Sequence, residues 1–400
     1  MSSVRIVILG AGPAGLSLAH RLLQLGEESF VVLEKEEAPG GLCRSVEVDG
    51  APLDLGGGHF LDVKRPEINR FLFGFLSEEQ WNTYDRKSTI QVQGVEIEYP
   101  FEANLWQFPI ERQLDYLESV ARAGCVTGAP MPDTFPDWVR WKLGDRIAED
   151  YMIPYNRKIW CLDDLVELGT YWLYKLPDVS FRETLESCLR RRLAGTMPAH
   201  RHFYYPREGG YGHVWKIMGE QLGDRLLCGR DPQRIELEPQ LRVDEYECER
   251  IVSTIPWPEF CRAADSVPDA VRDGVSSLKH ASIEVAYRPE NLPGPAHWTY
   301  IPSPELPHHR LLLRHNFCPG SRGHWTETNV SRASGPALWR HASEYSYPLN
   351  TVGKPDAIAT VLDWGRREGI VGLGRWGEWE HMNSDAAVEA GLRLADELCA

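Results

Sequence analysis

Hydrophobic and glycine positions near the start of the chain follow the order strand, turn, helix, strand. Residues 4–9 form an apolar run rich in β-branched side chains, which predicts a strand. The leucines of Leu16–Leu25 recur at helical spacing, and Gly26 ends that predicted helix. Phe30–Leu33 predicts a second strand, which Glu34 follows directly. This order is that of a βαβ unit of the dinucleotide-binding type.

The turn between the first strand and the helix carries the glycine spacing that such a unit needs. Gly10 permits a tight turn, Gly12 lets the backbone approach a pyrophosphate, and Gly15 lets the helix pack closely on the strand. The helix N-terminus faces the anion, and Glu34 is placed to accept hydrogen bonds from a ribose diol. The residues expected to contact the dinucleotide are Gly10, Gly12, Pro13, Ala14, Gly15, Glu34 and Lys35.

Two further glycine clusters favour FAD over NAD. Gly40–Ser45 follows the second strand, and Asp54–His59 follows a short predicted strand pair. In simple NAD domains the chain returns directly to another βα unit, whereas these turns suit an elongated cofactor whose flavin end needs more backbone donors. Either cluster alone is also typical of a hairpin turn. Together they add Gly41, Leu42, Gly57 and Gly58 to the expected cofactor contacts.

The rest of the chain alternates between helical and strand patterns. Helices are predicted where apolar residues recur at helical spacing, over Pro66–Leu76, Glu111–Ala123, Pro136–Tyr151 and from Asp385 to Leu398. A hairpin is predicted at Gln91–Tyr99, and strands at Gln240–Val243, Arg250–Pro256, Ser282–Tyr287 and Arg310–Arg314. The run Arg250–Pro256 is typical of a strand that returns to the dinucleotide-binding sheet.

Composition limits the classes of partner. The formal net charge is 43 − 58 = −15, which disfavours a nucleic-acid surface. No stretch approaches the roughly 20 apolar residues that span a bilayer, and the N-terminal apolar run lacks the basic leader of a signal peptide. The nine cysteines are scattered without CxxC pairs, as in a protein with reduced thiols. We therefore expect a cytoplasmic protein with no nucleic-acid or membrane partner. No metal is expected either, because the His-x-His pair at 200–202 has no acid beside it.

Further motifs occur in a fixed order along the chain. They are Tyr99–Asn104 (YPFEAN), Pro154–Trp160 (PYNRKIW), Pro206–Gly212 (PREGGYG), Tyr300–Pro302 ahead of Arg310 and Asn316, Tyr347–Pro348, and Gly374–Trp379 (GRWGEW). In this order they resemble the UDP-galactopyranose mutases, flavoenzymes that interconvert the pyranose and furanose forms of a nucleotide sugar. The resemblance runs over nearly the whole chain.

The resemblance implies an isomerase that works through a reduced flavin. Such a mutase interconverts the pyranose and furanose forms of a nucleoside-diphosphate hexose, through an adduct of the sugar on flavin N5 with no net redox. FAD is then active when reduced, with NAD(P)H or another reductant as the electron source. The expected partner is a nucleotide sugar of the UDP-galactose type, the expected role is galactofuranose and carbohydrate biosynthesis, and a homodimer is left open.

Pattern and resemblance together imply an α/β fold. A Rossmann-like FAD-binding domain is expected beside a helical insert and an antiparallel β-sheet domain, with the substrate cleft between them. The FAD-binding domain is expected over residues 1–62, 203–262 and 350–400. The mainly helical insert, with the substrate loop, is expected over 63–180, and the antiparallel sheet over 181–202 and 263–349.

The resemblance also gives individual residues a role. Arg310 is the expected diphosphate clamp, because a guanidinium binds phosphate oxygens bidentately, and Tyr300 and Tyr347 donate hydrogen bonds to the same phosphates. The expected catalytic residues are Arg310, Lys175, Tyr347, Tyr300 and His59. Substrate contacts are expected at Tyr99 and Phe101, which stack the base, and at Glu102, Asn156, Trp160, Arg182, Asn316 and His381. The remaining cofactor contacts are Gly209, Gly210, Arg375, Asn383, Ser384 and Asp385.

Glu102 departs from the family, which has a glutamine in this segment. An amide both donates and accepts, which matches the mixed edge of uracil, whereas a carboxylate only accepts. A carboxylate pairs well with guanine N1–H and N2–H₂ or with the cytosine amino group. A GDP-sugar is therefore an alternative to a UDP-sugar as the substrate. A third interpretation is that the Glu102 side chain points to solvent and contacts no base.

Other departures affect the diphosphate and flavin sites. Lys175, or Arg182 if the register shifts, stands for the family's second diphosphate arginine, and a lysine lacks the planar fork. His381 replaces a tyrosine near the phosphate. The turn at residues 56–58 has one more glycine than the family's, which leaves open whether His59 lies beside the flavin.

Two other classes of function stay open. An FAD-dependent oxidoreductase, of the amine oxidase or desaturase type, shares the glycine fingerprint and the run Ile251–Pro256. A non-catalytic nucleotide-binding protein would share the fold. The tyrosine and arginine motifs favour the mutase, because an apolar substrate does not need them.

Overall fold

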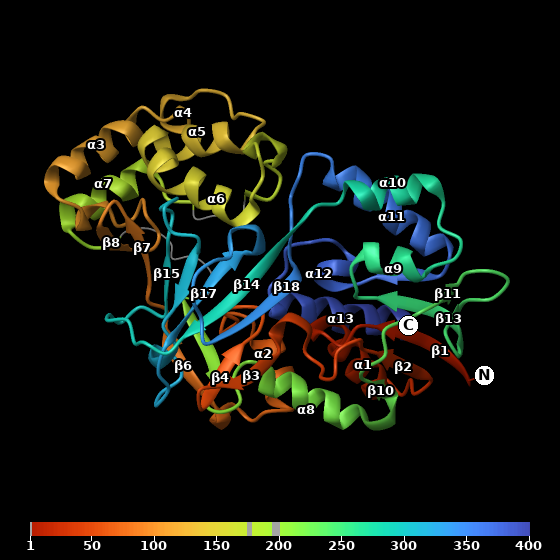
Figure 1. Ribbon diagram of the computed structural model, residues 1–400. Coiled ribbons are helices and arrows are strands. Elements are labelled where there is room, and N and C mark those ends of the chain that lie inside the picture. The colour runs from red at the N-terminus through yellow and green to blue at the C-terminus, as the bar shows by residue number, and fades with distance from the viewer. Residues whose placement is uncertain (1, 174–177, 194–200) are drawn as a thin grey trace.

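The computed structural model describes residues 2–173, 178–193 and 201–400, so Lys175 lies outside the described residues. Figure 1 shows the three parts of the molecule: a sheet and helices that contain both chain ends, a second sheet beside them, and a group of helices from the middle of the chain at the upper left. The predicted α/β fold with a Rossmann-like domain and antiparallel sheets is confirmed.

The predicted βαβ unit is formed by β1 (Ser2–Leu9), α1 (Pro13–Gln24) and β2 (Phe30–Leu33). β1 pairs in parallel with β2 on one side and with β13 (Tyr246–Ser253) on the other. β13 also pairs in parallel with β19 (Ile370–Gly372). The strand predicted near Arg250 therefore does return to the dinucleotide-binding sheet.

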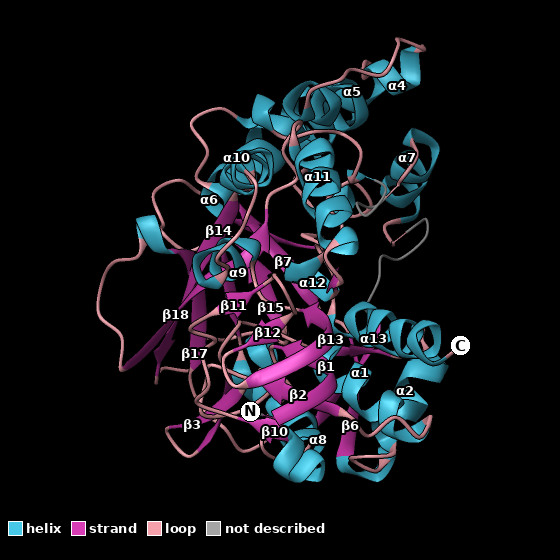
Figure 2. Cartoon of the chain, turned by 90° about the vertical axis from the view of Figure 1, so that its right-hand side faces the viewer, coloured by secondary structure: helices cyan, strands magenta, loops and turns pink. Residues whose placement is uncertain are grey.

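The β1 sheet is buried on both faces. Ile6 and Ile8 belong to one hydrophobic core, and Val7 and Leu9 belong to another. Alternate side chains of a strand point to opposite faces, which is why a continuous apolar run suits this central position. Helices cover both faces (Figure 2): α1, α8 (Gly212–Leu222) and α13 (Ser384–Cys399) on one, and α9 (Trp257–Ala263), α10 (Asp269–Ser277) and α11 (Lys354–Arg367) on the other.

The second large sheet differs from the predicted boundaries. Its order is β18 (Trp339–Pro348), β14 (His280–Arg288), β17 (His324–Asn329), β16 (Arg310–Leu312), β15 (Trp298–Tyr300), β7 (Ser88–Val92) and β8 (Val95–Glu98). The hairpin β7–β8 thus joins this sheet, although it lies within the segment 63–180 expected to be mainly helical. Ile90, Val92 and Ile97 alternate along it and pack into the core beneath the helices.

Smaller strands and helices complete the part built on the β1 sheet and the part built on the second large sheet. β10 (Leu226–Leu227), β11 (Ile235–Glu236) and β12 (Arg242–Val243) extend the β1 sheet. The others are the hairpin β3 (Ser45–Val48) and β4 (Ala51–Asp54), the sheet of β5 (Leu61–Asp62), β9 (His202–Pro206) and β6 (Trp81–Asp85), and the helices α2 (Pro66–Phe73) and α12 (Gly374–Gly377).

The upper helices are α3 (Ile110–Ala121), α4 (Gly124–Thr127), α5 (Phe135–Ile147), α6 (Ile153–Trp160) and α7 (Phe181–Arg190). The helix predicted over Pro136–Tyr151 is not continuous: α5 ends at Ile147, and a π-helical turn over Ala148–Met152 leads into α6. Gly144 has a φ of 77°, and a Cβ there would lie 2.6 Å from the Ser119 carbonyl oxygen. The positive φ and the close approach of α3 therefore both require glycine at the kink. α7, expected with the antiparallel sheet, contacts α3 instead.

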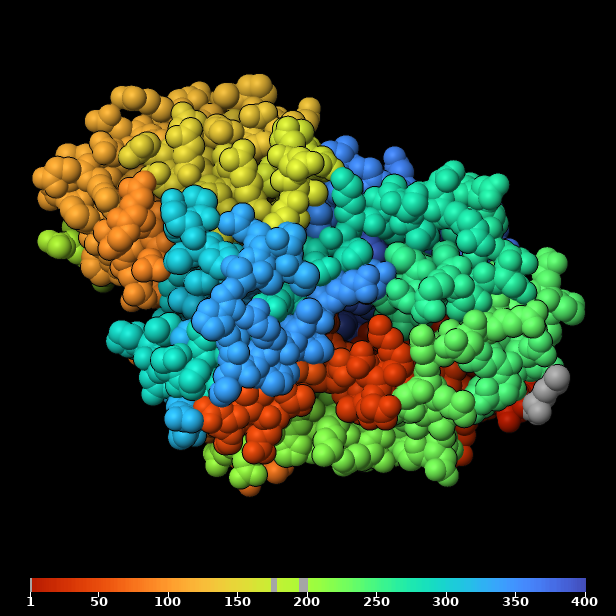
Figure 3. Space-filling view, in the orientation of Figure 1, coloured from red at the N-terminus to blue at the C-terminus, as the bar shows by residue number. Residues whose placement is uncertain are grey.

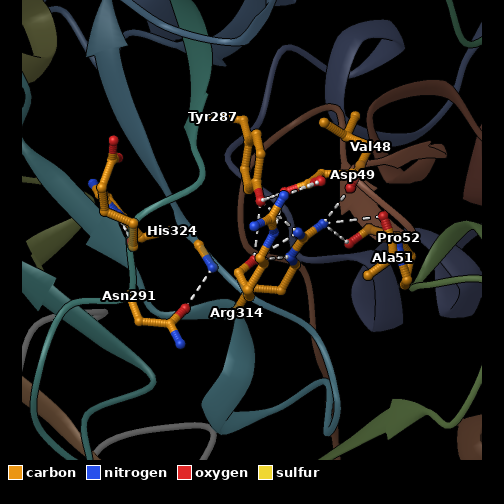
Figure 4. Close-up of polar contacts among 11 residues, drawn as sticks. Val48, Asp49, Ala51, Pro52, Tyr287, Asn291, Arg314 and His324 are labelled. Atoms are coloured by element: carbon orange, nitrogen blue, oxygen red, sulfur yellow. Dashed lines mark hydrogen bonds and ion pairs between the residues drawn. The ribbon is translucent and has the colours of Figure 1, made fainter.

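A buried arginine connects the β3–β4 hairpin to the antiparallel sheet (Figure 4). Arg314 is fully buried and donates hydrogen bonds to the carbonyl oxygens of Val48 (2.8 Å) and Ala51 (3.0 Å) in the hairpin. It also donates to the Arg322 carbonyl oxygen and, at 2.9 Å, to the Tyr287 hydroxyl of β14. The guanidinium therefore fixes the hairpin that precedes the Gly56–Gly58 turn.

We expect Arg314→Met to lower the free energy of unfolding by at least about 3 kcal/mol, because several buried carbonyl groups lose their donor. Arg322→Met is the matched control. Its side chain makes an exposed ion pair with Asp49, so its effect on unfolding should be much smaller. Urea denaturation followed by tryptophan fluorescence measures both, and equal effects of the two variants would contradict this account of Arg314.

Candidate active site

A first cavity, of about 380 Å³, runs along the carboxyl end of β1 and the N-terminus of α1. Figure 3 shows a hollow at this place, between red-orange N-terminal residues and the blue β18, with dark blue C-terminal residues at its floor. The predicted dinucleotide contacts that line it are Gly10, Gly12, Pro13, Ala14, Glu34, Lys35, Gly41 and Leu42. We call it the nucleotide cavity.

The backbone of the nucleotide cavity suits a dinucleotide. Gly12 precedes α1, whose N-terminus has no side-chain cap, so its amides are available to an anion. A Cβ at Gly15 would lie 2.1 Å from the Gly10 carbonyl oxygen, so only glycine allows the helix this close to the turn. The Glu34 carboxylate accepts hydrogen bonds from the amides of Ala11 (2.7 Å) and Glu36 (3.0 Å). Burial raises the pKa of Glu34, and these two hydrogen bonds oppose that effect.

A second cavity, of about 400 Å³, lies where the α5–α6 region meets the antiparallel sheet, and we call it the substrate cavity. It shares with the nucleotide cavity the residues His59, Arg375, Asn383 and Ser384. The two cavities therefore meet, and a long cofactor in the first would present its far end to the second.

His59 stands at this junction as a neutral ring. Burial, assisted by the charge of Arg375, lowers the pKa of His59 to about 4. Its Nδ1 lies 3.1 Å from the Gly57 carbonyl oxygen, which only accepts, so Nδ1 carries the proton. The lone pair of Nε2 is thus left for a donor at the junction. The extra glycine of the turn does not remove His59 from this place.

Arg375 is a partly buried cation at the same junction. It donates hydrogen bonds to the Ser346 carbonyl oxygen (2.7 Å) and from Nε to the Met382 carbonyl oxygen (3.0 Å). No carboxylate within the described ranges forms an ion pair with it, and burial lowers the pKa of Arg375. A partly buried cation without a counter-charge favours an anionic ligand.

Arg310 lines the substrate cavity, but one edge of its guanidinium is already occupied. Nε and Nη2 donate to the Glu327 carboxylate at 2.6–2.9 Å. Burial alone would raise the pKa of Glu327, but the charge of Arg310 and the neighbouring His309 hold it at about 2. Within the part of the chain that the structure describes, nothing accepts a hydrogen bond from Nη1. That end of Arg310 remains for a ligand.

Aromatic side chains form much of the wall near Arg310. The rings of Tyr99 and Tyr300 lie 5.4 Å apart, and Arg86 lies over Tyr99 at 4.6 Å and over Trp298 at 4.9 Å. Arg86 also donates to the Tyr300 hydroxyl at 3.3 Å. Tyr347 stacks on His381 with ring centroids 5.4 Å apart. The predicted residues that line this cavity are Gly58, His59, Tyr99, Glu102, Asn156, Trp160, Tyr300, Arg310, Tyr347, Arg375, His381, Asn383 and Ser384.

Glu102 lies at the end of this cavity that the helices form. It is 6% exposed and lines the cavity, so it does not point to bulk solvent. Burial raises the pKa of Glu102 to about 7, and its own backbone amide opposes that shift. In the described residues no other group donates a hydrogen bond to the carboxyl. A ligand that enters this end meets an acid to which no other described residue donates a hydrogen bond.

Several predicted contacts lie elsewhere. Phe101 does not line the cavity, because it is fully buried in the core under the helices and stacks on Tyr151. The amide of Asn316 donates instead to the carbonyl oxygens of Gly294 (3.0 Å) and Ala296 (2.6 Å). Arg182 is an exposed residue of α7 outside the cavity lining, and no placement is described for Lys175.

Five predicted cofactor positions do not line either cavity: Gly15, Gly57, Gly209, Gly210 and Asp385. Asp385, at the start of α13, forms an ion pair with Arg65 at 3.0 Å, so its carboxylate turns away from the junction. Gly209 and Gly210 form the turn before α8 with positive φ, and a Cβ at Gly210 would lie 2.6 Å from Ser45 Oγ. They shape the packing beneath the nucleotide cavity.

The sequence did not point to Arg86, Glu327, Trp298 or Tyr155. Arg86 and Glu327 are charged residues next to or within strands, a pattern that is also typical of exposed turns and sheet edges. Arg86 contacts Tyr300 of β15, and Glu327 pairs with Arg310 of β16, so both contacts depend on the order in which these strands join the sheet. Only the fold brings these distant segments together.

Comparison with known proteins identifies the class of fold first. Residues 8–74 match the family model of the NAD(P)-binding Rossmann-like domain. A zeta-carotene-forming phytoene desaturase of Myxococcus xanthus is 48% identical over 52 residues, a match that spans 13% of this chain and 10% of the desaturase. The segment shared with these curated relatives is therefore a small part of their length. A cyclohexylamine oxidase from Brevibacterium oxydans has a similar fold, with a TM-score of 0.67 and 16% identity over 99% of this chain and 98% of the oxidase.

A crystal structure of reduced UDP-galactopyranose mutase is similar over the whole chain. The TM-score is 0.88 with 21% identity, over 100% of this chain and 94% of the mutase. At this identity the likeness shows that the chain shares the fold of that mutase. None of the helices in the described part of the chain has the length and apolar character to span a bilayer.

Two glycine variants separate ligand binding from folding in the nucleotide cavity. A Cβ at Gly12 would meet nothing closer than the Gly41 Cα at 4.0 Å, and the φ of Gly12, −76°, suits any residue. We therefore expect Gly12→Ala to change the free energy of unfolding by less than about 0.5 kcal/mol. The same methyl group would occupy the place of a bound phosphate, so FAD affinity should fall about tenfold or more.

Gly15→Ala is the comparison variant and should lose both stability and FAD binding, because its Cβ meets the Gly10 carbonyl. Titration with FAD and with NAD, together with thermal unfolding, measures these effects. Unchanged FAD binding in Gly12→Ala would show that the dinucleotide does not lie across this turn.

Proposed function

We propose that this protein is a flavin-dependent mutase, an isomerase that interconverts the pyranose and furanose forms of a nucleoside-diphosphate hexose without net redox. One observation carries the proposal: a cavity suited to a dinucleotide meets a second cavity lined by three arginines, Arg86, Arg310 and Arg375, and by tyrosine hydroxyls. A substrate with a diphosphate group fits such a wall.

FAD fits the nucleotide cavity because the glycine turn, the uncapped α1 N-terminus and Glu34 suit its adenosine and diphosphate parts. When bound and reduced, FAD would supply the nucleophilic nitrogen that the reaction requires. NAD(P)H or another reductant supplies the electrons.

The residues of the substrate cavity hold and orient the nucleotide sugar. The free Nη1 end of Arg310 binds a phosphate oxygen, and the hydroxyls of Tyr300 and Tyr347 donate to the same group. These donors stabilise the negative charge that grows on the diphosphate when its bond to the sugar breaks. The neutral His59 lies at the junction, where the sugar meets the cofactor. The aromatic wall excludes water, which would otherwise hydrolyse a reactive sugar.

The charge of the cavity disfavours the alternative of an amine oxidase or desaturase. A cationic amine would face Arg310 and Arg375 in a partly buried space, and an apolar substrate would leave the charge of Arg375 and the Nη1 end of Arg310 without a ligand. The segment similar to a desaturase covers only 52 residues, or 13% of this chain.

The direct test is an isomerisation assay. Protein and FAD, reduced with dithionite, are incubated with UDP-galactopyranose and with a panel of GDP-hexoses, and the products are separated and detected by mass. We expect a new species of unchanged mass that forms only with reduced flavin. An oxidised product, or no product with flavin bound and reducible, would contradict the mutase assignment.

Tyr347→Phe should lower kcat/KM by about tenfold or more, because it removes one hydrogen bond to a charged phosphate and keeps the ring that stacks on His381. Tyr171→Phe is the matched control, since the Tyr171 hydroxyl donates to the Thr351 carbonyl oxygen at 3.1 Å and the residue does not line the cavity. Equal activities of the two variants would exclude a phosphate contact for Tyr347.

We further propose that Glu102 contacts the base. Its pKa of about 7 makes this contact pH-dependent. As the pH rises from about 6 to about 8 the acid ionises and becomes a pure acceptor, so GDP should bind more tightly and UDP more weakly. Glu102→Gln should remove both trends and favour UDP. Calorimetric titration of the two nucleotides across this range decides between the bases, and tighter binding of UDP than of GDP at the upper pH would contradict a guanine substrate.

A further inference from the structure

Glu327 is a fully buried carboxylate that receives hydrogen bonds from two different parts of the site. On one side it accepts from Nε and Nη2 of Arg310. On the other side its Oε1 accepts from the amide of Gly58 at 2.9 Å. The Nε2 of His309 lies 3.6 Å from Oε2. One side chain on β17 thus touches both the cation of the substrate cavity and the glycine turn at the junction.

The glycine turn is shaped to receive this carboxylate. Gly57 has a φ of 89°, and a Cβ on it would lie 2.3 Å from Glu327 Oε1. A side chain at position 57 would therefore displace the acid. Gly58 lines the substrate cavity and His59 lines both cavities, so the turn forms part of the wall where the cavities meet.

The same contact decides how Arg310 faces the cavity. With Nε and Nη2 held by Glu327, the guanidinium plane is fixed, and the Nη1 end is directed to a ligand. The acid also balances the charge of a largely buried arginine, which costs stability when it stands alone. A carboxylate has two acceptor oxygens and can serve both partners, whereas the amide of a glutamine has one acceptor and would meet a second donor with its own N–H₂ group.

We propose that Glu327 is a positioning residue that couples the Gly57–His59 turn to Arg310, so that the wall on the cofactor side and the cation on the substrate side keep one relative position. The proposal rests on the proposed function, because it takes the diphosphate of the substrate as the ligand of Arg310. If Glu327 couples the two, a change on the turn side of the contact and a change on the arginine side should have the same effect on activity. A residue that only stabilised the fold would not produce this equivalence.

The test breaks the coupling from each side. Glu327→Gln keeps the size of the side chain and removes one acceptor, and Gly57→Ala pushes the acid from the turn. Matched controls are Glu284→Gln, since Glu284 pairs with Arg340 at the surface of the same sheet, and Gly26→Ala, since Gly26 has a similar φ of 85° with nothing near its Cβ. Each variant is examined with FAD bound.

We expect kcat to fall about 10- to 100-fold in both Glu327→Gln and Gly57→Ala, with KM changed less than about threefold, because Arg310 keeps its charge and loses its orientation. The double variant should lose no more than either single variant, since both break the same link. Three results would overturn the proposal. The first is a double variant whose loss of kcat is the product of the two single losses, and the second is wild-type activity in Gly57→Ala. The third is a change of kcat and KM that only follows a fall in melting temperature.

A second readout does not depend on mutase activity. If the coupling exists, Glu327→Gln and Gly57→Ala should shift the visible absorption spectrum of bound FAD alike, because the same turn moves at the junction, while the two controls keep the wild-type spectrum. This result without isomerisation would reject the proposed function and retain the coupling. Spectra that do not change in either variant would reject the coupling even in an active mutase.

Discussion

The parallel pairing of β1 with β2 and β13 is the interaction on which the rest of the structure depends. Both faces of β1 are buried, and the strands around it come from the start, the middle and the end of the chain. The carboxyl ends of parallel strands meet at one edge of a sheet, which is where Gly10, Glu34 and Thr254 line the nucleotide cavity. The C-terminal segment closes the same cavity with Arg375 and Ser384, so the site exists only when both chain ends are in place.

Three arginines, one fully and two partly buried, show how surroundings separate structural from ligand-binding charges. Arg314 donates to hairpin and loop carbonyls and lines neither cavity, which is the arrangement of a structural cation. Arg310 has one edge held by a carboxylate and one end open to the substrate cavity. Arg375 is held by carbonyl oxygens at the junction of the cavities and has no acid partner among the described residues. The open donors and the uncompensated charge both lie where a diphosphate would bind.

The fold was predictable from local pattern to a large extent, and the site less so. The βαβ unit and its glycine turn could be read because strand period, helix period and glycine spacing are all local properties of the sequence. The prediction for Phe101 failed because a motif gives a position and no direction: Tyr99 lines the cavity, whereas Phe101 packs into the core beneath the helices. The role of Glu327 could not be predicted from the sequence, because its contact with Arg310 depends on the order in which β15, β16 and β17 join the sheet. The kink at Gly144 likewise depends on a carbonyl of another helix.

The π-helical turn over Ala148–Met152 has a consequence for how this chain tolerates insertions and deletions. A π turn holds one residue more than an α turn, and here it lies between α5 and α6, with Tyr151 and Met152 in the cavity wall. The turn absorbs its extra residue locally, so loss of one residue here would restore a regular α-helix while the helix after it keeps its orientation. Asn156 and Trp160 would then stay in the cavity wall, whereas the wall that Tyr151 and Met152 form within the turn would change. In the divergence of this fold, a single-codon deletion here would thus reshape one stretch of the cavity and leave the rest of the site in register.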